Sequence, residues 1–232
     1  TAIIFSVQTN IQTKSSAKST RAEELEQIKK SIKEKGAKWE AADNSIFQLS
    51  DEERKKRANL KKEEKISAAS YTTDENPPAQ MTVVPASLDW RNNGGNFVTP
   101  IRNQGNCGSC WAFATTAGLE SDVLIAKNQP NTNLDLSEQV MVSCSGYGSC
   151  SGGGVSPNFV RDTGLPAESC YPYTATNGSC ASACANWQES ASKIGNFYSV
   201  PRTINDIKTA LATYGPLTTT FAVYADFFSY SS

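Results

Sequence analysis

Residues 104 to 113 read Gln-Gly-Asn-Cys-Gly-Ser-Cys-Trp-Ala-Phe, and this run limits the fold more than any other part of the chain. Apolar residues then recur at helical spacing, which predicts a long buried helix from Ser109 or Cys110 to about Lys127. Cys110 would lie at the N-terminus of that helix. Free backbone N–H groups and the helix dipole can lower the pKa of a thiol there, so the run predicts a nucleophilic cysteine.

The seven cysteines all fall between Cys107 and Cys184. Seven is odd, so one thiol is left free if the others pair. The first 84 residues carry 15 Lys/Arg and 13 Asp/Glu, whereas the remaining 148 carry only 7 and 10. This shift predicts a domain boundary near residue 84, followed by a disulfide-bearing domain from an oxidising compartment.

Other function classes are disfavoured by composition. The formal net charge is −1 and the second segment has no basic cluster, which argues against nucleic acid or an anionic membrane as partner. No apolar run reaches the roughly 18 residues that a membrane span needs.

Two other interpretations of the cysteines, as a redox pair and as a zinc site, are weaker than the interpretation of one of them as a nucleophile. We predict no metal or cofactor. Cys107-x-x-Cys110 lacks the βαβ surroundings of a thioredoxin-like pair, and a zinc site would have only one tightly spaced pair among Cys107, Cys110, Cys144 and Cys150.

Local signals predict several elements outside this run. Thr20 and Glu23 have the spacing of a capping box and predict a helix over about 21–35, and Ser50 and Glu53 predict a second one to about Lys65. Residues 67–84 have linker chemistry. Leu136-Ser137-Glu138-Gln139 predicts a helix to about Cys144, residues 151–154 a tight backbone, and residues 217–224 a strand.

The run Cys107-Gly108-Ser109-Cys110-Trp111 matches the signature C-G-[SA]-C-[WY] of papain-type cysteine peptidases. Together with the Leu-Ser-Glu-Gln and Cys-Ser-Gly-Gly elements, it makes the chain resemble the papain-like, cathepsin-type cysteine peptidases. The resemblance implies an α+β, two-domain fold. Residues 1–84 would be a helical pro-segment with its linker, and residues 85–232 the peptidase domain. That domain would have a helical left part over about 95–190 and a β-rich right part of which only the first strands are present.

The resemblance also implies the roles of individual residues. Cys110 would be the nucleophile, and the Gln104 side-chain amide with the Cys110 N–H would bind the oxyanion. Substrate would be bound by Gly108, Ser109, Trp111, Gly152 and Gly153. Disulfides are implied for Cys107 with Cys150 and for Cys144 with Cys180, which leaves Cys170 with Cys184 as a third pair.

The implied function is that of a secreted or lysosome-like cysteine endopeptidase, which acts on peptides or proteins and is made as a zymogen with its own pro-segment as inhibitor. Such a peptidase needs a histidine as general base, and the sequence contains none. In the family that histidine lies about 130–150 residues beyond the cysteine, which here means past Ser232. We therefore expect a truncated chain that is inactive alone and could need a complementing C-terminal fragment. The alternative is a non-catalytic, papain-fold binding protein.

Overall fold

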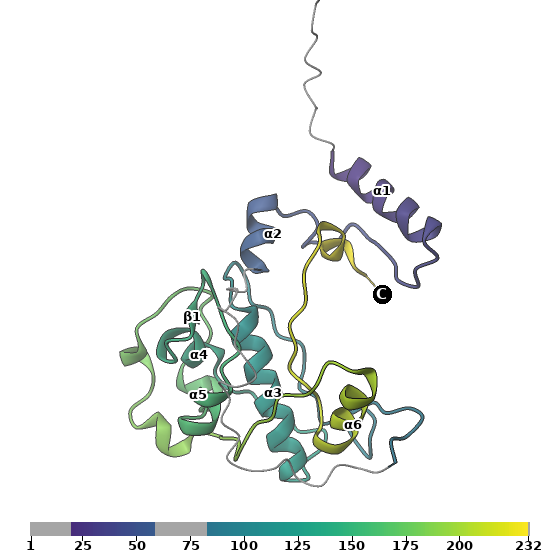
Figure 1. The fold of residues 1–232 in the computed structure, drawn as a ribbon. Coiled ribbons are helices and arrows are strands. Elements are labelled where there is room, and N and C mark those ends of the chain that lie inside the picture. Colours follow the sequence, from purple (N-terminus) through teal and green to yellow (C-terminus); the bar gives the residue numbers. More distant parts are fainter. Residues whose placement is uncertain (1–19, 59–82, 232) are drawn as a thin grey trace, which may run out of the picture. The chain divides into compact units, whose positions relative to one another are not determined.

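The computed structural model describes residues 20–58 and 83–231 (Figure 1). The chain divides into two compact units. The first unit contains residues 1–49 and 224–232, and the second contains residues 50–223. This division does not coincide with the domain boundary near residue 84, which stays a prediction from the sequence.

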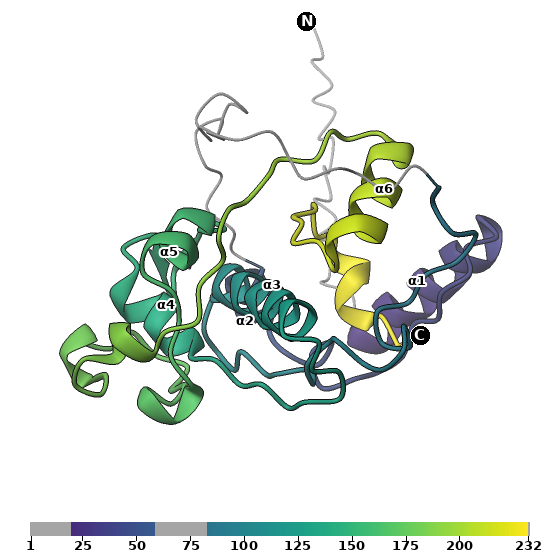
Figure 2. The ribbon, with the colours of Figure 1, turned by 90° about the horizontal axis from the view of Figure 1, so that it is seen from below.

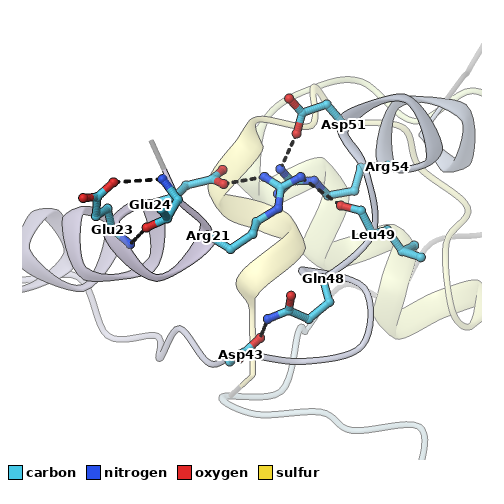
Figure 3. Close-up of polar contacts among 9 residues, drawn as sticks. Arg21, Glu23, Glu24, Asp43, Gln48, Leu49, Asp51 and Arg54 are labelled. Carbon is cyan, nitrogen blue, oxygen red and sulfur yellow. Dashed lines mark hydrogen bonds and ion pairs between the residues drawn. The ribbon is translucent and has the colours of Figure 1, made fainter. Parts of the chain in front are cut away.

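Helix α1, Arg21–Glu34, belongs to the first unit and begins at the predicted capping box. The Thr20 Oγ1 accepts from the Glu23 N–H at 3.3 Å, and the Glu23 carboxylate accepts from the Thr20 N–H at 2.8 Å. Arg21 forms an ion pair with Glu24 and donates to the Leu49 carbonyl at 2.9 Å (Figure 3). The expected helix over 21–35 is therefore confirmed. Its first residue, Arg21, is hydrogen-bonded to Leu49, which lies further along the chain.

Chain segments far apart in sequence pair within the first unit. Ala41 and Tyr230 form an antiparallel bridge, and the rings of Trp39 and Tyr230 lie 6.0 Å apart. Tyr230 directly follows the 3₁₀ helix η5, Ala225–Ser229. Phe47 is fully buried. The first unit is thus stabilised by a few aromatic side chains and by backbone hydrogen bonds between its two segments.

The second unit begins with helix α2, Asp51–Arg57. Its capping box is formed by Ser50 and Glu53 as predicted, and Arg54 pairs with Asp51 at 2.7 Å (Figure 3). The helix was expected to reach about Lys65. Residues 59–65 lie outside the described residues, as does the linker predicted over 67–84 except for its last two residues.

Helix α3, Cys110–Ala126, is the central element of the second unit. Its residues Trp111, Leu119 and Leu124 are almost fully buried, as expected for a helix that is apolar on several faces. In both views α4 and α5 lie on one side of α3 and α6 on the other (Figures 1 and 2). The remaining helices of this unit are α4 Glu138–Cys144, α5 Pro157–Asp162, α6 Ile204–Tyr214 and the 3₁₀ helices η2 Glu168–Cys170, η3 Cys180–Ser182 and η4 Trp187–Ser190.

In the described part of the chain, the one sheet is a two-stranded antiparallel hairpin, in which β1 Gly148–Ser149 pairs with β2 Gly152–Gly153. The predicted strand over 217–224 is wrong, because these residues are irregular. A strand needs a partner for its backbone hydrogen bonds, and no described segment pairs with this one. The run is instead attached to α3 by the Thr218 hydroxyl, which donates to the Ala114 carbonyl at 3.2 Å. None of the described helices has the length and apolar character to cross a membrane.

Candidate active site

The predicted nucleophile Cys110 is the first residue of α3. It is half-buried and is the one free cysteine, because the other six form disulfides. Those disulfides join Cys107 to Cys150, Cys144 to Cys180, and Cys170 to Cys184. They are the pairs that the resemblance implies, and the leftover thiol lies at the helix N-terminus.

Burial raises the pKa of the Cys110 thiol, and this is the largest effect on it. The backbone N–H groups of Trp111 and of Cys110 itself face the sulfur and lower the pKa in part. The lowered pKa that the helix start predicted is therefore not reached. The physical reason is that burial penalises the charged thiolate more than the two N–H groups stabilise it.

Gln104 lies on the loop that leads into α3, and its side-chain amide uses both hydrogens. Its Nε2 donates to the Cys107 carbonyl at 2.8 Å, which fixes the amide on its own loop. It also donates to the Arg57 carbonyl, at the end of α2, at 3.0 Å. The first bond sets the direction of the amide, so the second hydrogen is aimed at a carbonyl oxygen outside the loop.

Gly108 has no room for a side chain. A Cβ at this position would lie 2.6 Å from the Lys56 carbonyl oxygen and 2.8 Å from that of Cys150. The Gly108 N–H donates to the same Cys150 carbonyl at 2.9 Å. The loop is thus pressed between α2 and the segment to which Cys107 is disulfide-bonded.

Trp111 supports the β1–β2 hairpin. Its Nε1 donates to the Ser149 carbonyl at 3.3 Å, and a Cβ on Gly148 or Gly153 would come within 2.6 Å of its ring. Gly152 adopts φ +104°, a conformation that glycine tolerates and other residues rarely adopt. Bare glycine backbone therefore lies directly against Trp111, the residue that follows Cys110.

Ser109 directly precedes Cys110 and is fully buried. It is the N-cap residue of α3, but its hydroxyl does not cap the helix. The hydroxyl lies instead 2.6 Å from that of Tyr173, which in turn donates to the Gln104 carbonyl at 2.9 Å.

The structure gathers the predicted site residues around one helix start. Arg57 and Tyr173, which were not predicted as site residues, contact Gln104 from far along the chain. Nothing in the local pattern around either residue indicates these contacts. The predicted roles in catalysis and substrate binding stay predictions. Among the described residues, no cluster of His, Cys, Asp or Glu could hold a metal ion.

A group of carboxylates in the second unit act on one another electrostatically. Glu120 is buried and accepts from the Thr99 hydroxyl and from the Leu136 N–H at 2.8 Å. Burial raises the pKa of Glu120, and it raises that of Glu138 to about 7. Both carboxyl groups are buried, and we assign them to the stability of the fold.

Residues 84–232 match the sequence model of a protein family, the "Papain family cysteine protease" family. The chain belongs to the papain family of cysteine proteases. Its papain-like α+β fold, predicted from the sequence, is confirmed by this match and by likeness to procathepsin structures. One of them is the digestive procathepsin L2 proteinase from Tenebrio molitor larval midgut, with a TM-score of 0.65 and 26% identity. That match covers 84% of this chain and 63% of the other, so it extends to residues that precede the family match.

Two curated papain-family relatives are similar in sequence. The chain is 38% identical over 160 residues to the cathepsin L-like proteinase of Fasciola hepatica, which is 66% of this chain and 47% of that protein. It is 39% identical over 158 residues to the pro-cathepsin H of Mus musculus, which is 64% of this chain and 44% of that protein. The matched part thus spans less than half the length of these relatives.

Proposed function

We propose that the protein is a papain-type cysteine endopeptidase. The observation that carries this proposal is the free thiol of Cys110 at the start of α3, on the loop where the Gln104 amide is fixed with one hydrogen aimed at a carbonyl oxygen. A nucleophile and an oriented hydrogen-bond donor are the two parts that acyl transfer requires. The family membership of residues 84–232 and the proteinase relatives support the same activity.

The chemistry follows from these groups. The Cys110 thiolate forms a bond to the substrate carbonyl carbon, and the C=O electron pair moves onto oxygen. The Gln104 amide and the Cys110 N–H stabilise this oxyanion. The C–N bond then breaks, the amine leaves with a proton, and water hydrolyses the thioester and releases Cys110. Loss of one oxyanion donor typically costs about 10²–10³ in rate. The proton transfers need a general base, and the printed sequence has no histidine, so the full-length gene product is the protein to assay.

We infer further that the protein is made as a zymogen, with α2 as part of the inhibitory pro-segment. The Arg57 carbonyl accepts the hydrogen of Gln104 that a substrate carbonyl would need, and the Lys56 carbonyl lies against Gly108. Substrate therefore cannot reach the amide while α2 is in place. The raised pKa of Cys110 also keeps the thiol protonated and poorly nucleophilic in this state. Three disulfides support an oxidising, secretory or lysosome-like location.

The activity is tested by titration with a thiol-directed peptidyl epoxide. The printed chain, the full-length gene product and its matured form without residues 1–84 are labelled, each with a Cys110→Ser control. We expect stoichiometric labelling and peptide hydrolysis in the matured form, both lost in Cys110→Ser, and slow labelling of the other two. A folded, matured full-length protein that neither reacts nor hydrolyses peptides would favour a non-catalytic binding protein.

The inhibitory role of α2 is tested by adding residues 1–84 in trans to the matured enzyme. Ser50→Ala removes the cap of α2, which is worth about 1 kcal/mol, and should weaken inhibition about fivefold. Thr20→Ala removes the equivalent cap of α1 and is the matched control, with a smaller expected effect. Equal inhibition by the Ser50→Ala and unmodified segments would contradict the assignment to α2.

A further inference from the structure

Tyr173 connects the two ends of the nucleophile loop. Its hydroxyl oxygen lies 2.6 Å from the Ser109 Oγ and 2.9 Å from the Gln104 carbonyl oxygen. Its ring meets Phe113 of α3 edge-on, with centroids 4.9 Å apart. Its backbone N–H donates to the Glu168 carboxylate at 2.6 Å. The ring and the backbone of Tyr173 are thus both fixed, and its hydroxyl is held between Ser109 and Gln104.

The direction of these hydrogen bonds follows from the chemistry of the groups. The Gln104 carbonyl can only accept, so Tyr173 must give it its single hydroxyl hydrogen. The Tyr173 oxygen is then an acceptor toward Ser109, and the buried Ser109 hydroxyl must donate to it. The result is a one-way chain of hydrogen bonds from Ser109 through Tyr173 to Gln104.

This chain of hydrogen bonds joins the two backbone segments that carry the predicted oxyanion donors. The Cys110 N–H belongs to the peptide group between Ser109 and Cys110, so holding Ser109 sets the direction of that N–H. The Gln104 carbonyl belongs to the backbone from which the side-chain amide extends. The bond from that amide to the Cys107 carbonyl, at 2.8 Å, fixes the amide only relative to the loop itself. Tyr173 supplies the connection from outside the loop.

We propose that Tyr173 is a positioning residue that holds the Gln104 amide and the Cys110 N–H in the arrangement needed to bind the oxyanion. This inference rests on the proposed peptidase function. It adds a role for a residue that touches neither the thiol nor the substrate in the mechanism above. Burial also raises the pKa of the Tyr173 hydroxyl, so the group keeps the hydrogen that it donates.

The test compares Tyr173→Phe with Tyr171→Phe in the matured full-length enzyme. Tyr171 is buried, whereas Tyr173 is partly buried, and the Tyr171 hydroxyl donates to the Ser179 carbonyl at 2.9 Å, so this control loses a similar bond away from the loop. We expect Tyr173→Phe to lower kcat about 10- to 100-fold, because small misplacements of catalytic groups have effects of this size. KM should change less than about threefold, since ground-state binding is left in place.

Ser109→Ala removes the hydroxyl at the other end of the chain of hydrogen bonds. It keeps the proposal testable if Tyr173→Phe fails to fold. We expect a similar loss of kcat, and a double variant no worse than about the larger single effect, because the two groups act as one unit. An unchanged kcat in Tyr173→Phe, an effect on KM alone, or an equal loss in Tyr171→Phe would overturn the proposal.

A second readout separates this proposal from the peptidase function. The rate of Cys110 alkylation by iodoacetamide is measured against pH in the same variants, with no substrate present. A changed profile in Tyr173→Phe and Ser109→Ala, but not in Tyr171→Phe, would support the positioning role even if the unmodified enzyme hydrolysed no peptide. An unchanged profile in both variants of an inactive protein would overturn it.

Discussion

The loop over residues 104–111 and the run over residues 217–224 both carry strong local sequence signals, yet only the loop has the structure that its signal predicted. In the loop, Gly108 is enclosed by two carbonyl groups, Cys107 is cross-linked, and Gln104 makes two side-chain hydrogen bonds. In the run, Phe221 and Tyr224 are 62% and 73% exposed, and the backbone is irregular.

The difference lies in where the stabilising partners come from. Helix α3 makes its own backbone hydrogen bonds, and a disulfide and close packing hold the loop before it. A strand has no internal hydrogen bonds and depends on another segment. A pattern of Thr, Val and aromatic residues therefore indicates only a preference for extended backbone, and no described segment pairs with this run as a strand.

The largest effect is expected from the disulfide that closes the loop region. Replacing Cys107 and Cys150 by serine should lower the free energy of unfolding by about 4 kcal/mol, because the bond closes a long stretch of chain. Removing the Cys170–Cys184 bond, which closes a separation of only 14 residues, should cost about 3 kcal/mol. Urea unfolding of both variants gives the values. A smaller loss for the first pair would show that the loop does not depend on its cross-link.

A glycine substitution tests the close packing in the same region. Gly153→Ala would place a Cβ 2.5 Å from the Trp111 ring, and overpacking of this kind costs about 1–3 kcal/mol. Gly195→Ala is the matched control, since a Cβ there would have nothing within 4 Å. Thermal melts of the two variants should differ clearly. Equal melting temperatures would mean that the hairpin moves away from Trp111 at little cost.

The buried carboxylates of the second unit predict a dependence of stability on pH. Burial, with the nearby carboxylates, raises the pKa of Glu138 from 4.5 to about 7, so folding favours its neutral form. The stability that depends on Glu138 is therefore fully present below about pH 4.5 and is lost as the pH rises toward 7, by on the order of 2 kcal/mol. Glu138→Gln should flatten this part of the profile of melting temperature against pH.

The exposed Glu189→Gln is the control for this prediction and should leave the slope between pH 4.5 and 7 as it is. A Glu138→Gln profile as steep as that of the unmodified protein would assign the dependence to other groups. The neighbours whose negative charge raises the pKa of Glu138 are Glu168, Glu120 and Asp135.

The smallest effects are expected in the run over residues 217–224. Thr218→Ala removes the hydroxyl that donates to the Ala114 carbonyl and should cost about 0.5–1 kcal/mol. Thr220→Ala, at an exposed position, should change stability by less than about 0.5 kcal/mol. A loss above 1 kcal/mol for Thr220→Ala would show that the run has partners that its irregular backbone does not reveal.

Elements with local determinants were predictable. The capping boxes at Thr20 and Ser50 gave the starts of α1 and α2, and Ser137 gave the start of α4. The family signature also pointed to Gln104 and Cys110 as neighbours on one loop. Contacts between distant residues were not predictable, since Tyr173 lies 64 positions beyond Ser109 and Gln104 lies 47 beyond Arg57.

The pKa of Cys110 shows the same limit. The sequence placed the thiol at a helix N-terminus, which favours a lower pKa, and that placement is confirmed. The depth of burial depends on how the whole unit packs, and burial is the larger effect. The direction of the shift could therefore be read only from the structure.

The Cys107–Cys150 disulfide and the Gly108 N–H bond to Cys150 have a mechanical consequence. They clamp the segment that ends at Cys110 to the segment that continues into β2, a few residues away on each side. Stiffness between the Cys110 sulfur and this glycine backbone is thereby built into covalent structure. A force on Gly152 or Gly153 is therefore transmitted to the start of α3 rather than absorbed by a flexible hinge.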